Sequence, residues 1–172
     1  MTIPCKNLRM ENKISFRHFQ KRAFTLLEIA IVTSILSIIA LITIPGLLRT
    51  RINANHTAVI SDLKVFGSSN DMYRPQQSPP VFAPNVGALT AGNIPFLDTT
   101  WNTANAVPGK HNYTFTYSAD PNGAAYSMVA APANIMGVNT YCVDQTSVIV
   151  GGNGGGAPTG NAAGCTGGTP IT

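Results

Sequence analysis

The sequence has 172 residues, of which 44% are hydrophobic and only 10% are charged, and its net charge is +4. This length fits one small domain. The charge is unevenly distributed: residues 1–23 hold six Lys or Arg and one Glu, a net charge of +5, while residues 24–172 hold five basic and six acidic residues, a net charge of −1. The basic character therefore belongs to the first 23 residues. Without a basic patch beyond them, nucleic-acid binding is excluded as the main role.

A long apolar run follows the basic segment. Glu28 is the single charged residue between Phe24 and Leu48, and the 20 residues from Ile29 to Leu48 carry no charge. A helix of this length spans about 30 Å, the thickness of the hydrocarbon core of a bilayer. We therefore expect residues 24–48 to form a single transmembrane helix. The positive charge before the run predicts that the N-terminus stays in the cytoplasm and that the rest of the chain crosses the membrane.

Three kinds of segment combine a basic start with an apolar run: a signal peptide cut after the run, an uncut signal anchor, and a leader cut before the run. The run is too long for a signal peptide, and no small-x-small cleavage site follows it closely. The flanking residues distinguish the other two.

These flanking residues resemble the cleavage site of type IV prepilins. Residues 21–23 (Lys-Arg-Ala) precede residues 24–28 (Phe-Thr-Leu-Leu-Glu), whereas the family has basic residues, Gly and then Phe-Thr-Leu-x-Glu. The match departs at Ala23, which replaces the Gly. Residues 44–55 resemble the next part of a pilin helix. Three later segments resemble the closing strands of one bacterial pilin subgroup, namely residues 113–117, 126–132 and 143–149.

This resemblance implies a processing and assembly pathway. Prepilin peptidase would cut between Ala23 and Phe24, the new amine of Phe24 would be N-methylated, and Glu28 of an incoming subunit would pair with that amine on a neighbour. Identical subunits would pack through residues 24–73 into a helical filament on an inner-membrane assembly platform. A charge costs up to about 2.5–3.5 kcal/mol at the bilayer centre, so Glu28 needs such a partner. The alternative is an interfacial Glu28 that reaches water.

The helix is expected to continue beyond the membrane as an amphipathic segment, residues 49–74. Five apolar residues at steps of 4, 7, 4 and 3 fall on one helical face: Leu48, Ile52, Val59, Leu63 and Phe66. Pro45 and Gly46 are predicted to interrupt the helix, because proline removes a backbone hydrogen bond. Arg74 followed by Pro75 predicts its end.

Residues 75–172 are expected to form a globular head, giving an α+β, pilin-like fold in which the long helix packs on a small antiparallel sheet. Residues 75–110 suggest an irregular connection with a short helix near Thr90–Trp101, and Trp101 is interpreted as an anchor to the core. Alternating residues and a turn at residues 120–123 predict four strands: 113–118, 124–130, 138–143 and 147–150. The Gly-rich residues 151–172 suggest a flexible C-terminal loop.

Two cysteines remain after removal of the leader, which contains Cys5. Cys142 and Cys165 form an even pair in a part of the chain predicted to lie outside the cytoplasm, where disulfides persist. A Cys142–Cys165 disulfide is therefore predicted, and two free thiols are the alternative. The three histidines are scattered and no Cys/His cluster occurs, so no metal site or cofactor is predicted.

The sequence contains no paired carboxylates on one element, no Gly-x-Ser-x-Gly and no Cys/His dyad, so no enzymatic activity is expected. The favoured function is a structural subunit of a type IV pilus, which moves from the inner membrane into an extracellular filament. The alternative is a type II secretion pseudopilin in a short periplasmic filament. Major pseudopilins tend to carry an acidic calcium loop near the C-terminus, and the presence of only Asp144 there favours the pilus. A monomeric membrane-anchored binding domain is a third possibility.

Overall fold

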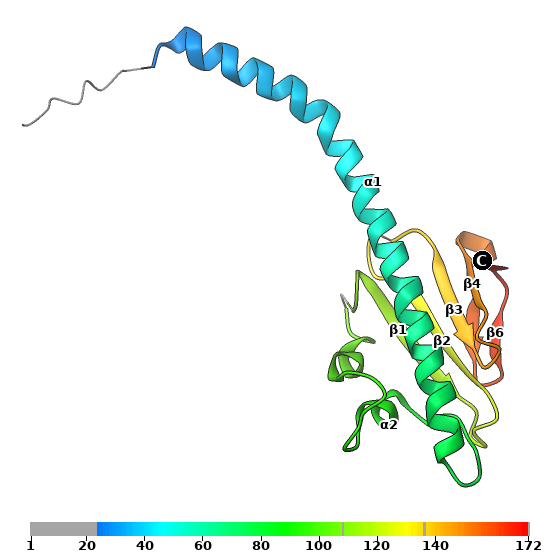
Figure 1. Ribbon diagram of the computed structural model, residues 1–172. Helices are drawn as coiled ribbons and strands as arrows, with labels where there is room; N and C mark the ends of the chain where they lie inside the picture. The colour runs from blue at the N-terminus through cyan, green and yellow to red at the C-terminus, as the bar shows by residue number, and fades with distance from the viewer. Residues whose placement is uncertain (1–23, 108, 136, 172) are drawn as a thin grey trace, which may run out of the picture. The chain divides into compact units, whose positions relative to one another are not determined.

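The computed structural model describes residues 24–107, 109–135 and 137–171. The predicted leader, Ala23 included, lies outside the described residues. The chain divides into two compact units, Met1–Leu41 and Ile42–Thr172, and the helix α1 (Leu26–Tyr73) contributes to both. All strands found in the described residues belong to the second unit (Figure 1).

Helix α1 is continuous over 48 residues, and Pro45 lies inside it. The prediction that Pro45 and Gly46 interrupt the helix is therefore wrong, because the α-helix continues through both residues. Proline removes one N–H from the helical ladder, and the turns on either side keep their own bonds. Just after this point, the hydroxyl of Thr50 donates to the carbonyl of Gly46 at 3.0 Å. The predicted end of the helix is confirmed, because α1 gives way to a 3₁₀-helix, η1 (Arg74–Gln76).

The second part of α1 packs against the head through a buried stripe. Val59, Leu63 and Phe66 are fully buried, as the spacing predicted. Leu48 is 45% exposed and Ile52 is only partly buried, so the buried stripe is shorter than predicted. Apolar spacing identifies a helix face but does not distinguish a side chain that meets the sheet from one that faces outward.

The sheet has five antiparallel strands in the order β1-β2-β3-β4-β7, which confirms the predicted antiparallel sheet. Its strands are β1 (Tyr113–Ala119), β2 (Tyr126–Pro132), β3 (Thr140–Asp144), β4 (Ile149–Gly152) and β7 (Thr169–Pro170). Strand β2 begins two residues later than predicted. The turn from Asp120 is longer than four residues, because the Asp120 N–H donates to Ala125 O at 2.9 Å and the Asp120 carboxylate accepts from Ala124 N at 3.3 Å.

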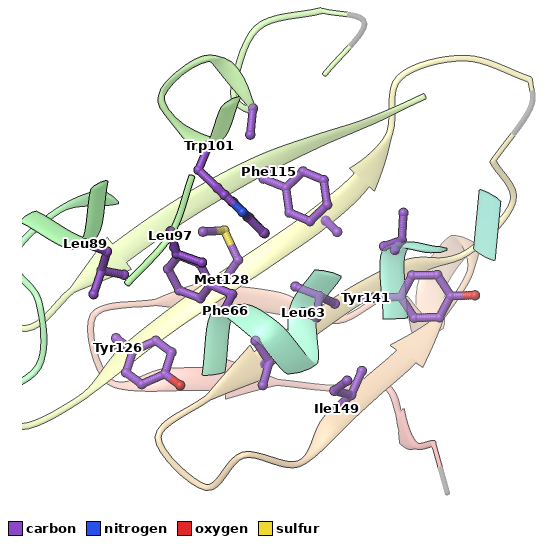
Figure 2. Packing of buried hydrophobic residues seen from close by; sticks show 14 of the residues in the cluster. Leu63, Phe66, Leu89, Leu97, Trp101, Phe115, Tyr126, Met128, Tyr141 and Ile149 are labelled. Atoms are coloured by element: carbon purple, nitrogen blue, oxygen red, sulfur yellow. The ribbon is translucent and has the colours of Figure 1, made fainter. Parts of the chain in front are cut away.

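Phe66 is central to the core between α1 and the sheet (Figure 2). Its ring centroid lies 5.3 Å from that of Trp101, 5.4 Å from that of Tyr117 and 6.2 Å from that of Tyr126. Trp101 is only 3% exposed, so its predicted role as an anchor to the core is confirmed. Aromatic side chains from α1, two strands and the connecting segment therefore meet around one residue of the helix.

The connection between α1 and β1 contains two short helices where one was predicted. They are α2 (Val86–Thr90) and the 3₁₀-helix η2 (Thr99–Thr103), so the predicted helix near Thr90–Trp101 is misplaced. Each begins at a polar cap. The side chain of Asn85 accepts from Ala88 N at 2.9 Å, and that of Asp98 accepts from Thr100 N at 2.8 Å. These caps set the helix boundaries, because an Asn or Asp oxygen satisfies an otherwise unpaired N–H of the first turn.

The predicted flexible C-terminal loop is in fact structured. It contains the 3₁₀-helix η3 (Gly154–Gly156), a hairpin of β5 (Thr159–Asn161) and β6 (Gly164–Thr166), and β7 at the edge of the sheet. The hairpin lies against β2 and β3. The Ser127 hydroxyl donates to Asn161 O at 2.9 Å. A Cβ on Gly160 would come within 2.6 Å of Ser127 and Val129, so this close approach requires glycine.

A disulfide and a carboxylate attach the hairpin to the sheet. Cys142 of β3 and Cys165 of β6 form the predicted disulfide, with 6.0 Å between their Cα atoms. Asp144 accepts from Cys165 N at 3.0 Å with one oxygen and from Thr146 N at 2.9 Å with the other. Burial alone would raise the pKa of Asp144, but the hydrogen bonds from Thr146 and Cys165 outweigh it and lower the pKa below its usual value.

The core position of Phe66 predicts a large loss of stability in Phe66→Ala. Truncation of a buried Phe leaves a cavity, so the free energy of unfolding should fall by about 3–5 kcal/mol. Chemical unfolding of the full chain in detergent micelles would measure it. The neighbouring Val65 is half exposed. Its replacement, Val65→Ala, should cost less than about 1 kcal/mol. Equal losses in the two variants would contradict this description of the core.

Removal of the disulfide by the double change Cys142→Ser and Cys165→Ser should reduce the free energy of unfolding. The two cysteines are separated by 23 residues. Closure of a loop of this size contributes about 3 kcal/mol on the chain-entropy model. Amide hydrogen exchange should also become faster in residues 159–166. Ala162→Ser, a substitution within the same hairpin, should leave both measurements unchanged, and unaltered exchange in the double variant would show that the disulfide is dispensable.

Candidate assembly site

The first part of α1 exposes a continuous apolar surface. Leu26 is 92% exposed, and most of the aliphatic side chains up to Leu48 are also exposed. One helix among the described residues, Leu26–Gln76, is long and apolar enough to cross a membrane, with a mean hydropathy of 2.5 in its most apolar window and none of that window buried. This surface therefore needs lipid or other polypeptide chains to cover it.

Two hydroxyl groups within this apolar surface donate to the helix itself. Thr33 donates to the carbonyl of Ile29 at 2.9 Å, and Ser37 donates to the carbonyl of Thr33 at 2.7 Å. Such bonds to the preceding turn hide a polar group that would otherwise be costly in an apolar medium. These two hydroxyls therefore do not prevent this part of α1 from lying in a bilayer or against other helices.

Glu28 lies in the first turn of α1, and Phe24, just before the helix, is exposed. The hydroxyl oxygen of Thr25 accepts from Glu28 N at 3.1 Å and so caps the helix. A carboxylate in the first turn also interacts favourably with the positive end of the helix dipole. The sequence analysis did not identify this cap, although a Thr three residues before a Glu is the spacing of a capping box. Glu28 is exposed, and no cation of the described residues forms an ion pair with it.

The predicted site residues thus fall into separate places. Glu28 lies in the first turn of α1 and Phe24 just before the helix, while the cysteine pair lies in the head. The predicted pairing joins two subunits, so it stays a prediction. The cleavage itself is not tested, because Ala23 lies outside the described residues.

In the head, Asp62 of α1 attaches the segment that leads into β1. Its carboxylate lies 3.7 Å from the Lys110 ammonium and 3.5 Å from Nε2 of His111. The Lys110 ammonium also lies 4.1 Å from the centroid of the Trp101 ring. One carboxylate and one aromatic face thus hold the same lysine. These contacts fix the helix against the start of the sheet.

His56 of α1 contacts the first residue of β1, the loop after β2 and strand β3. Its Nε2 accepts a hydrogen bond from Val138 N at 3.4 Å, so the ring is neutral in this arrangement. Its ring centroid is 6.2 Å from that of Tyr113 and 5.8 Å from that of Tyr141. Partial burial lowers the pKa of His56, because removal from water disfavours the charged ring. Burial also raises the pKa of Tyr113, to about 12.

The described residues do not fit a metal site. No group of three or more His, Cys, Asp or Glu side chains among them could hold an ion. Both carboxylate oxygens of Asp144 accept hydrogen bonds from this chain, as described above. The residues around Asp144 therefore do not supply the acidic calcium loop that major pseudopilins tend to carry.

No family model matches the sequence. The chain is 31% identical over 112 residues to the type II secretion system core protein G of Dickeya chrysanthemi, a match that covers 64% of this chain and 69% of that protein. It is 38% identical over 58 residues to the protein of the same name from Klebsiella michiganensis, and 38% identical over 55 residues to that of Klebsiella pneumoniae. These two matches cover 34% and 32% of this chain, and 41% and 39% of the relatives.

The apolar helix with its capped acidic start and the antiparallel sheet define a pilin-like protein. The extent of the Dickeya match then places it more closely: the chain belongs to the family of type II secretion system core protein G.

The lowered pKa of His56 predicts that acid destabilises the head. The folded state binds the proton less readily than the unfolded state, whose histidine pKa is 6.5. Stability should therefore fall as the pH drops below this value towards the lower pKa of the folded state. In His56→Gln the loss between pH 7.5 and pH 5, measured by thermal unfolding, should be smaller. Asn53→Gln places the same side chain one turn earlier and should retain the full loss, and an identical pH dependence in both variants would exclude His56 as the cause.

Proposed function

We propose that this chain is a structural subunit of a type II secretion pseudopilus. It is inserted in the inner membrane by residues 24–48, with its N-terminus in the cytoplasm and its head in the periplasm. Prepilin peptidase cuts the bond between Ala23 and Phe24, and Phe24 is N-methylated. The processed subunits then pack through residues 24–73 into a short filament on the inner-membrane platform. The role is architectural, and no reaction is assigned to the chain.

The observation that carries the proposal is the exposed apolar surface of α1 with one acid at its start. In a chain of the core protein G family, such a surface suits a subunit that leaves the bilayer by exchanging lipid for neighbouring helices. Both environments are apolar, so the exchange costs little free energy. Glu28 supplies the polar contact that fixes the position of one helix along the next.

The similarity to core protein G favours the pseudopilin, the alternative in the sequence analysis, over the type IV pilus that was favoured there. The lack of an acidic calcium loop was poor evidence against a pseudopilin. In this chain the segment around Asp144 is held without a metal ion, by the Cys142–Cys165 disulfide and by hydrogen bonds to Asp144.

The pairing role predicts that Glu28→Gln blocks assembly. The amide keeps the size of the side chain but removes its charge, which leaves the partner amine unpaired. Because breaking a buried ion pair costs about 3–5 kcal/mol, the filament yield should fall at least about tenfold. The yield would be measured by immunoblotting of sheared filaments from cells that supply the rest of the secretion system. Glu28→Asp keeps the charge and should retain part of the yield.

N-terminal sequencing of the same samples separates processing from pairing. The mature protein should begin at Phe24 in every variant. A normal yield of filaments from Glu28→Gln would rule out the pairing role. A mature protein that began at Met1, or at a site beyond Leu48, would contradict the proposed processing. Filaments found in the medium, with no periplasmic form, would instead support the pilus.

A further inference from the structure

One edge of the sheet has backbone groups that no described residue uses. Strand β1 is the outermost strand on its side. The N–H of Phe115 donates to Ala104 O at 2.9 Å, away from β2, and strand residues alternate in direction. The N–H and C=O groups of Tyr117 and Ala119 therefore also point away from β2. Tyr126, which lies opposite Ala119, donates its N–H to the side chain of Gln145, just after β3. This N–H therefore points away from β1, in agreement with the register.

Described residues partly cover the first half of this edge, and they leave the second half open. Ala104 and Lys110 pair with Phe115 and Tyr113. Among the backbone hydrogen bonds of the described residues, none reaches the outward groups of Tyr117 or Ala119. At the opposite side of the sheet, β7 is only two residues long and ends at Pro170, which has no N–H. The second half of β1 is thus the long edge left open.

A groove of about 380 Å³ lies directly beside this open edge. Its lining includes Thr116, Tyr117 and Ala119 of β1, and α2 and η2 contribute Gly87 and Asn102. No charged residue lines it. A neutral groove disfavours a charged ligand, because such a ligand would lose its hydration without gaining an opposite charge. The backbone edge and the neutral groove together fit an uncharged polypeptide in extended conformation.

We propose that the edge of β1 at Tyr117 and Ala119 binds an extended, uncharged segment of a different protein by β-strand addition. Backbone hydrogen bonds hold about four residues of the partner, and the groove accepts its side chains. Within the chain, Phe115 of this edge already donates a backbone hydrogen bond to Ala104. The partner would form the next backbone hydrogen bonds along the same strand. A different protein is the assigned occupant rather than a second copy, because the open part of β1 in a copy is only Tyr117–Ala119, and each described head loop of five or more residues contains Pro or Gly, which disfavour an extended strand.

The test uses the full chain in detergent micelles and a capped six-residue peptide of alternating threonine and valine. Trp101 lines the groove and is the single tryptophan of the sequence, so its fluorescence should change in a saturable way on titration with the peptide. Two further peptides carry N-methyl groups on alternate residues, one peptide on the odd-numbered residues and the other on the even-numbered residues. The peptide whose methyl groups replace the N–H groups that face β1 should bind about fivefold to tenfold more weakly, because a hydrogen bond is lost. The other peptide should bind normally.

Variants of the chain provide the second arm. Ala119→Pro removes one outward N–H without removing a bond to β2, and it should weaken peptide binding by a similar factor. Ala162→Pro, in the turn of the β5–β6 hairpin, should bind normally.

The proposal is overturned by equal binding of both N-methylated peptides, or by the absence of a saturable signal. Self-association that the peptide competes away and Ala119→Pro abolishes would also overturn it, since the occupant would then be a second copy. Glu28→Gln should bind the peptide normally, which separates this inference from the assembly proposal.

Discussion

Helix α1 carries apolar side chains along its whole length, but the described chain covers only the later ones. Val59, Leu63 and Phe66 meet the sheet and its aromatic residues, whereas most aliphatic side chains from Leu26 to Leu48 are exposed. Apolar surface left in water costs about 25 cal/mol per Å², so this part of the helix is not stable in an aqueous environment. This division of one helix into a covered and an uncovered part constrains the rest of the structure. The head folds around the later half of the helix, and the earlier half requires lipid or neighbouring helices to cover it.

One face of the sheet packs against the helix through aromatic residues. The β5–β6 hairpin packs against the opposite face. Residues 126, 128 and 130 of β2 are buried in the core, so Ser127 and Val129 face the opposite side of the sheet, where Gly160 of the β5–β6 hairpin approaches them. The hairpin would be too small to fold alone. Its position is fixed by the disulfide to β3 and by the hydrogen bonds that Asp144 accepts.

The sequence predicted those parts of the fold that depend on side-chain pattern. The long helix, its end at Tyr73, the antiparallel strands and the disulfide all follow from local spacing or from cysteine count. The hairpin and β7 were missed because glycine has no side chain to alternate, and here the absence of a Cβ at Gly160 is what permits packing on β2. The family was also beyond the sequence motif alone, because the same Phe-Thr-Leu-x-Glu start serves both pilins and pseudopilins. Only similarity along most of the chain favoured one over the other.

The cap at Thr25 gives the assembly hypothesis a physical basis that the sequence motif lacks. If the chain is cut before Phe24, a positive amine appears two residues ahead of the first helical turn. A positive charge near the N-terminus of a helix is unfavourable, since the helix dipole has the same sign there. The carboxylate of Glu28 offsets both charges when the subunit is alone in the membrane. In the proposed filament, Glu28 of one subunit would pair with the amine of the next, so that neither charge is left unpaired among apolar helices. Hydrophobic contact would bring the helices together, and this one polar contact would select their register.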